Sequence, residues 1–185
     1  MVDLQIGEET SCVVADIVTR PYLNESGLPS SAVAEVEDEV IVLPASSAQA
    51  RMWFLHRLAG GDDAYGMPVA VRLRGELDLR ALDHALASVV RRHEVLRTTF
   101  SAVDGEPVQV VHPAGPARWP LVDLCALPEA EREHRAERLL RDEARRPFDL
   151  ARGPLLRTVL VRVAPDEHLA LCAMHHVVTD GWSLR

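Results

Sequence analysis

The chain contains few cysteines, with only Cys12, Cys125 and Cys172 among its 185 residues. No two of them have the CxxC spacing of a redox or zinc site, and an odd number leaves one thiol outside any pairing. This usage predicts a reduced, cytoplasmic setting rather than a disulfide framework.

Targeting and membrane segments are also lacking. The start, Met-Val-Asp-Leu-Gln-Ile-Gly-Glu-Glu, has neither the basic residues nor the apolar core of a signal peptide, and no apolar run is long enough to span a bilayer. The formal charge of −8, with arginines interspersed among glutamates, argues against a nucleic-acid partner. With 48% hydrophobic residues, the chain is long enough for one globular domain or one lobe of a larger one.

Several familiar catalytic motifs are absent. There is no Walker loop and no dinucleotide fingerprint. His93-Glu94 lacks the second histidine of a zincin helix, and the stretch from Gly181 ends in Arg185 where a nucleophile elbow needs glycine. The sequence therefore predicts no bound metal or cofactor and no covalent nucleophile of these types.

The remaining pattern divides the chain into two parts. Residues 1–38 show no strong periodicity, and we interpret them as a leader or linker. Residues 39–185 form the globular part, with strands predicted at 40–44, 67–73, 97–103, 108–111, 155–163 and 168–178, and with helices starting at Ser46, Asp78 and Leu127. This order predicts an α/β or α+β fold, a mixed sheet with helices packed on it.

Local signals fix several boundaries. Ser46 and Gln49 have the spacing of a capping box, and Asp78 is a plausible N-cap. Asp104-Gly105 predicts a two-residue hairpin turn, and 155–163 with 168–178 predict an antiparallel hairpin. The expected apolar faces are Ala48, Met52, Leu55 and Ala59 on the first helix, Leu82, Ala85, Leu86, Val89, His93 and Leu96 on the second, and Leu139, Leu140 and Ala144 on the third.

Two adjacent histidines, His175 and His176, close the apolar run of the last predicted strand. Because side chains alternate along a strand, one ring can face a cleft while the other packs inside. A neutral imidazole, with an ordinary pKa near ~6.5, can accept a proton at cytoplasmic pH. Asp180 could orient a ring or pair with an arginine, and Gly181 favours a turn close to a ligand. A purely structural histidine pair is the alternative, and adjacent strand histidines cannot both bind one metal ion.

Three segments resemble those of condensation domains of nonribosomal peptide synthetases. The run from His175 to Gly181 matches the HHxxxDG signature, which a wider chloramphenicol acetyltransferase-like superfamily shares. The segments 46–55 (SSAQARMWFL) and 92–100 (RHEVLRTTF) match two further motifs in the expected order. The resemblance covers about Val40 to Arg185, and the simplest role for the two additional segments is structural.

The resemblance implies the N-terminal lobe of a chloramphenicol acetyltransferase-like enzyme with its site between two lobes. Such domains join an acyl or peptidyl thioester on one carrier domain to the amine of an aminoacyl thioester on another, both held on phosphopantetheine arms. By this match His176 is the catalytic histidine, His175 and Asp180 support the geometry, and the Gly181 amide lies near the reacting carbonyl. Asp180 is expected to pair with Arg92 or Arg97 in a supporting role.

The sequence departs from the family by stopping at Arg185, before the latch and floor-loop segments of a second lobe. We expect the isolated chain to be inactive and its partners to be carrier domains, adjacent synthetase domains and the missing C-terminal lobe. A stand-alone acyltransferase using coenzyme A or a carrier, a non-catalytic remnant or interaction module, and an epimerisation relative stay open as alternatives.

Overall fold

The computed structural model describes residues 13–18, 39–59 and 65–180. These residues form a five-stranded sheet in the order β1-β3-β8-β7-β6 and a three-stranded sheet in the order β2-β5-β4. The elements are β1 (Val13–Val18), β2 (Ile41–Pro44), α1 (Ser47–Leu58), β3 (Gly66–Arg74), α2 (Leu79–Arg92), the 3-10 helix η1 (Glu94–Arg97), β4 (Thr98–Val103), β5 (Glu106–Val111), β6 (Leu121–Asp123), α3 (Glu129–Ala144), β7 (Leu156–Ala164) and β8 (Glu167–His175).

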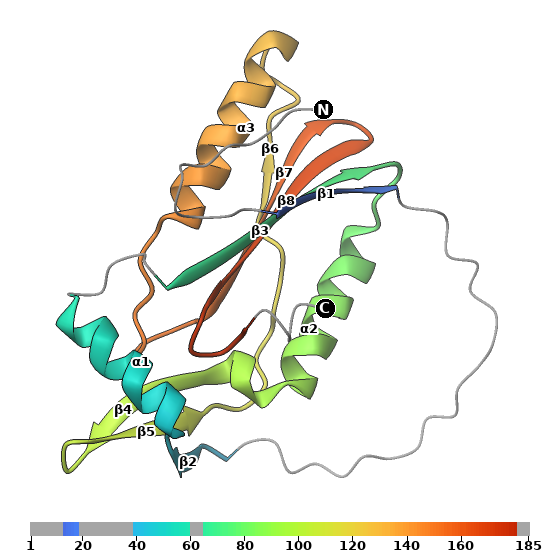
Figure 1. Ribbon diagram of the computed structural model, residues 1–185. Helices are drawn as coiled ribbons and strands as arrows, with labels where there is room; N and C mark the ends of the chain where they lie inside the picture. Colours follow the sequence, from blue (N-terminus) through green and yellow to red (C-terminus); the bar gives the residue numbers. More distant parts are fainter. Residues whose placement is uncertain (1–12, 19–38, 60–64, 181–185) are drawn as a thin grey trace, which may run out of the picture.

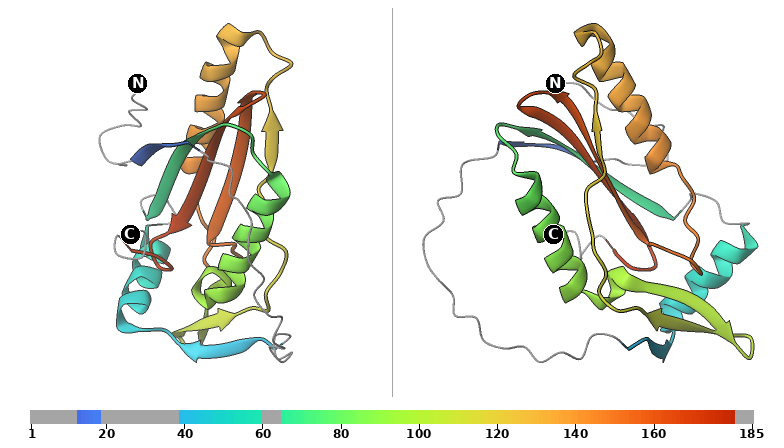
Figure 2. Two further views of the ribbon diagram at one scale, coloured as in Figure 1. Left: turned by 90° about the vertical axis from the view of Figure 1, so that its right-hand side faces the viewer. Right: turned by 180° about the vertical axis from the view of Figure 1, so that it is seen from behind.

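Strand β8 lies at the centre of the larger sheet, antiparallel to both neighbours (Figure 2). Met174 lies opposite Met67 of β3 on one side and opposite Leu156 of β7 on the other. The predicted β7–β8 hairpin is therefore confirmed. At the sheet edges, β1 pairs parallel with β3 and β6 pairs parallel with β7. Strand β6 was not predicted, and β1 falls within the proposed leader.

Helices cover both faces of this sheet, α3 one face and α2 the other (Figure 1). Ala136, Leu140 and Ala144 of α3 are buried against the sheet, so the narrow apolar stripe predicted there is confirmed at Leu140 and Ala144. Leu82 of α2 packs against the opposite face. The α+β layering expected from the sequence is thus confirmed. Within the described residues, no helix is both long and apolar enough to cross a membrane.

Helix α2 begins as predicted but ends earlier. The Asp78 carboxylate accepts hydrogen bonds from the N–H groups of Arg80 and Ala81, which confirms the N-cap. The helical spacing had extended to His93 and Leu96, and this was wrong because the backbone of His93 leaves the helical region and η1 follows.

Helix α1 confirms the capping box but turns a different face inward. Ser46 accepts from the Gln49 N–H, and the Gln49 side chain accepts from the Ser46 N–H. Gln49 also donates to Gln109 of β5, which fixes the rotation of the helix. The helix packs through Met52, as predicted, and through Trp53 and His56, whereas the predicted Ala48 and Ala59 are exposed.

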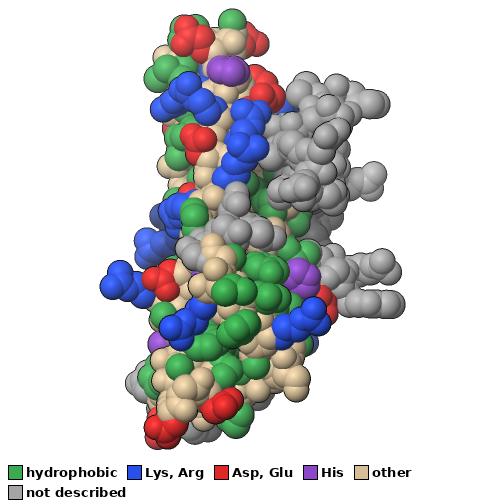
Figure 3. Space-filling view, turned by 60° about the vertical axis from the view of Figure 1, so that its left-hand side comes forward, with side chains coloured by type: hydrophobic (Ala, Val, Ile, Leu, Met, Phe, Trp, Pro, Cys, Tyr) green, Lys and Arg blue, Asp and Glu red, His purple; other side chains and the backbone are tan. Residues whose placement is uncertain are grey.

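The opposite side of α1 carries exposed apolar side chains. Phe54 is 61% exposed and Leu58 is 74% exposed. Figure 3 shows hydrophobic side chains gathered with arginines beside them on the lower half of this view. Exposed apolar side chains gathered in this way are typical of a surface that contacts a partner.

The hairpin turn of the smaller sheet is confirmed. Asp104 and Gly105 both have positive φ, 52° and 87°, as a type I′ turn requires. Strand β5 begins at Glu106, two residues before the predicted start, because pairing with β4 continues to the turn.

Candidate active site

The chain turns sharply after β8. The strand was predicted to reach Val178, but it ends at His175, and the Val178 N–H closes a turn on the His175 carbonyl at 3.0 Å. The His175 N–H donates to Leu155 just before β7 (3.0 Å), whereas the His176 N–H donates to Tyr65 just before β3 (2.8 Å). The backbones of the two histidines are therefore held from opposite sides, one by the segment that leads into β7 and the other by the segment that leads into β3.

His175 is the inner ring of the pair. Its side chain is 1% exposed, and its Nδ1 accepts a hydrogen bond from the Val177 N–H at 3.0 Å. A ring that accepts at Nδ1 is neutral and carries its proton on Nε2. Burial, reinforced by repulsion from His56 and His176, lowers the pKa of His175 to about 4. His175 is thus held neutral at physiological pH.

The His175 ring lies in a box of three other rings. His56 meets it edge-on with centroids 5.3 Å apart, Phe148 meets it edge-on at 5.8 Å, and Tyr65 lies tilted at 5.9 Å. These rings come from three different segments, and sequence reasoning missed all three. Only His56 had a detectable signal, because it falls on one helical face with Gln49, Met52 and Trp53.

Arg157 supports the box from behind Phe148. Its guanidinium carbon lies 3.8 Å from the Phe148 ring centroid, and its side chain is 5% exposed. It donates to the carbonyls of Pro147 and Glu143, both at 3.1 Å, and to that of Arg146 at 2.5 Å. Its Nε lies 2.8 Å from the Glu143 carboxylate. The end of α3 is thereby tied to β7, and Phe148 is held against His175.

His176 is the outer ring of the pair. It is only partly buried, in contrast to its neighbour. Its Nδ1 is inaccessible to solvent and has no hydrogen-bond partner. A partly open imidazole on an ordered turn is suited to hold or move a proton on an arriving group, although not through the enclosed Nδ1. The expectation that one histidine packs inside is confirmed at His175, whereas a cleft in front of His176 stays a prediction.

The other predicted site residues come from two parts of the chain, the segment that follows His176 and the segment from Arg92 to Arg97. Asp180 is exposed at the end of the described region, and Gly181 lies outside it. Arg92 is exposed, and Arg97 donates to the His112 carbonyl and lies 3.4 Å from the Glu94 carboxylate. The pairing of Asp180 with Arg92 or Arg97 stays a prediction.

The other chemical groups near the turn are possible metal ligands and the thiol of Cys172. Across residues 13–18, 39–59 and 65–180, no group of His, Cys, Asp and Glu side chains is arranged to hold a metal ion. Cys172 is a free thiol on β8, and burial raises its pKa to about 11. Such a thiol is protonated at neutral pH and is a poor nucleophile. Nucleophilic chemistry by Cys172 is therefore disfavoured.

Comparison with known proteins decides the family. The Condensation domain family model matches residues 40–185. The chain belongs to the condensation domain family. It is 45% identical over 177 residues to a linear gramicidin synthase protein of Brevibacillus parabrevis, covering 95% of this chain and 2% of that protein. It is 48% identical over 143 residues to chondramide synthase cmdD of Chondromyces crocatus, covering 77% and 4%.

Solved condensation domains share the fold. The starter condensation domain of rhizomide synthetase RzmA has a TM-score of 0.67 at 26% identity, over 77% of this chain and 34% of that one. The first condensation domain of the calcium-dependent antibiotic synthetase, in complex with substrate analogue 2a, has a TM-score of 0.68 at 25% identity, over 78% and 34%. The chain thus spans about a third of these structures and a few per cent of the two synthetases. The predicted family and chloramphenicol acetyltransferase-like fold class are confirmed.

Proposed function

We propose that this chain supplies the histidine half of a condensation site. The amine of a carrier-bound aminoacyl thioester attacks the carbonyl carbon of a carrier-bound acyl or peptidyl thioester. A C–N bond forms, the C–S bond breaks, and the proton lost by the amine leaves with the thiol. Family membership and the contrast between buried His175 and partly open His176 support this proposal.

The single observation that carries the proposal is the turn that separates the two rings. His175 is neutral, buried and bonded to the Val177 N–H, so it fixes the backbone that presents His176. His176 takes the proton from the attacking amine, or holds that amine and the tetrahedral centre in place. Asp180 and the Gly181 amide have supporting roles in this proposal, at the turn and near the reacting carbonyl.

Carrier domains and adjacent synthetase domains are the partners that follow from this reaction. The phosphopantetheine arms of the carriers bring both substrates, so the chain needs no bound cofactor of its own. The cytoplasm is the setting we propose, and the free thiols of Cys125 and Cys172 agree with reducing conditions.

A graft tests the proposal directly. Residues 40–185 replace the matching segment of the linear gramicidin synthase protein compared above, and amide formation between that synthetase's own carrier-bound substrates is followed by mass spectrometry. His176→Ala should lower the rate by about 10²- to 10⁴-fold, the usual contribution of a positioned acid or base.

The control variant is His134→Ala, which removes an exposed histidine on α3 and should leave the rate unchanged. A graft that forms no amide, or a His176→Ala graft as fast as its parent, would contradict the proposal.

A further inference from the structure

A cavity of about 720 Å³ lies between α2, the start of β7 and the connection from β5 to β6. This connection passes close to both α2 and β7 (Figure 2), because the Trp119 N–H donates to Asp83 of α2 at 2.7 Å and Thr158 of β7 donates to the Arg118 carbonyl at 3.1 Å. The described walls of the cavity contain neither His175 nor His176. The proposed condensation chemistry therefore leaves this space without a role.

One part of the cavity wall is apolar. Leu86 and Val90 face it from α2, Leu96 from η1, and Leu156 and Val159 from β7. These side chains are only partly buried, although they lie between packed elements. The volume is within the range of small-molecule pockets, about 300 to 1,000 Å³. An apolar body of moderate size would complete their burial.

The rest of the wall is strongly basic. Five arginines line the cavity against a single carboxylate, Glu143, in a chain whose formal charge is −8. Arg97 and Arg157 lie deep, with side chains 13% and 5% exposed. Arg118, Arg146 and Arg152 lie at the surface. Glu143 is already shared by Arg146 at 3.3 Å and Arg157 at 2.8 Å, so it cannot neutralise the whole set.

Some of these arginines have structural roles. Two of them, Arg97 and Arg152, nevertheless keep hydrogen-bonding or charge capacity that the protein itself does not use. The Nε of Arg97 is buried and has no hydrogen-bond partner, even though its terminal nitrogens contact His112 and Glu94. Arg152 lies 3.9 Å from the Asp149 carboxylate and its side chain is 88% exposed, so that ion pair is weak. A buried donor without an acceptor and under-neutralised cations at the rim both indicate a missing anion.

We propose that this cavity binds an amphipathic anion, a single phosphate or carboxylate group carried on an apolar body. The charged group lies among the arginines, where planar guanidinium groups suit the oxygens of phosphate or carboxylate. The apolar body lies against Leu86, Val90 and Leu156. His176 is not part of the cavity wall, so the binding test and the condensation test can fail independently.

Calorimetric titration of the full chain with three probes tests the site. Octyl phosphate carries both chemical features, inorganic phosphate carries only the anion, and octanol carries only the apolar body. Octyl phosphate below its micelle concentration should bind at least about tenfold more tightly than either other probe. Binding should weaken several-fold as salt rises from about 0.05 to about 0.5 M, because the distance over which the rim charges act falls from more than about 10 Å to only a few ångströms.

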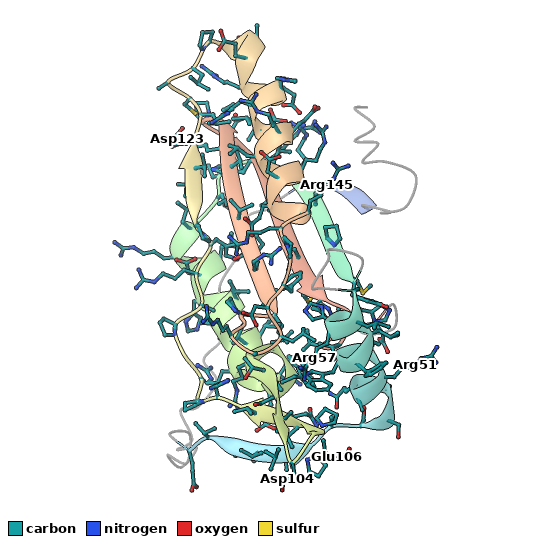
Figure 4. All side chains as sticks on the ribbon, turned by 90° about the vertical axis from the view of Figure 1, so that its left-hand side faces the viewer. Arg51, Arg57, Asp104, Glu106, Asp123 and Arg145 are labelled. Carbon is teal, nitrogen blue, oxygen red and sulfur yellow. The ribbon has the colours of Figure 1, made fainter. Side chains whose placement is uncertain are left out.

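Matched variants assign the binding to the cavity. Arg118→Gln with Arg152→Gln should weaken octyl phosphate binding about fivefold or more. Leu86→Ala should weaken octyl phosphate without changing inorganic phosphate, with circular dichroism checking the fold. The control is Arg51→Gln with Arg135→Gln, which removes the same charge from exposed positions outside the cavity and should change affinity less than about twofold; Arg51 projects outward from α1 (Figure 4).

Three results would overturn the proposal. One is the absence of octyl phosphate binding up to millimolar concentration. Another is equal binding of octyl phosphate and octanol, which would show that the arginines contribute nothing. The third is an equal loss in the control pair, which would show general surface attraction rather than a site.

Discussion

The Nδ1 atom of His175 accepts a hydrogen bond from the Val177 N–H at 3.0 Å, so the first histidine of the signature folds the turn that contains the second. The ring is 1% exposed and lies among His56, Tyr65 and Phe148. A conformational role for His175 follows from this one contact.

His175→Ala should therefore destabilise the fold. It removes a buried ring and leaves the Val177 N–H without its acceptor, at a cost of about 2–4 kcal/mol. His175→Asn should lower the free energy of unfolding by less, because an amide oxygen can still accept a hydrogen bond from the Val177 N–H. Chemical denaturation measures both variants, and equal losses would show that ring packing, not the hydrogen bond, fixes the turn.

Stability should depend on pH through the same residue. The pKa of His175 is about 4 when folded and near ~6.5 when unfolded. As pH falls, the His175 imidazole is therefore protonated in the unfolded chain before it is protonated in the folded chain. The stabilisation is complete above pH ~6.5 and is lost as pH falls toward 4, by up to about 1.4 kcal/mol per pH unit.

The measurement is the free energy of unfolding at several values between about pH 7 and pH 5, compared with His175→Asn. Burial also lowers the pKa of His168, so the variant should keep a shallower slope of the same sign. An unchanged slope would show that His175 does not titrate in this way.

Arg157→Met should destabilise the chain by about 3 kcal/mol or more. The buried guanidinium satisfies three carbonyls at the end of α3 and stacks on Phe148, and its removal leaves those acceptors and Glu143 without their donor. Arg152→Met provides the control. Its exposed ion pair should be worth less than about 1 kcal/mol in the same thermal or denaturant unfolding assay.

Ser46→Ala tests the capping box of α1. It removes the acceptor for the Gln49 N–H, 3.2 Å away, and should cost about 1 kcal/mol of unfolding free energy. Ser47→Ala, one residue later and equally exposed, should change stability by less than about 0.5 kcal/mol. Equal effects at the two positions would argue against the cap.

Features encoded in local sequence were predictable. The Ser46 and Asp78 caps, the Asp104-Gly105 turn and the β7–β8 hairpin each depend on a few neighbouring residues. The burial of one histidine of the pair followed from its place at the end of an apolar strand. The family followed from three ordered motifs that agree with one another.

Features that depend on distant partners were not predictable. Strand β6 has three residues and exists because it pairs with β7, not because of its own pattern. The inward face of α1 is chosen by contacts such as Gln49 with Gln109, which override the position of small alanines. The rings around His175 and the guanidinium behind Phe148 come together only through the fold.

The four-ring box has a consequence for recombination between synthetases. His56, Phe148 and His175 stand far apart in the chain yet share one packed volume. A crossover anywhere from 57 to 174 would draw these rings from two parents that never adapted to each other, whereas one placed before Ser46 inherits the set intact. Chimeras joined outside this interval should fold more often than those joined within it.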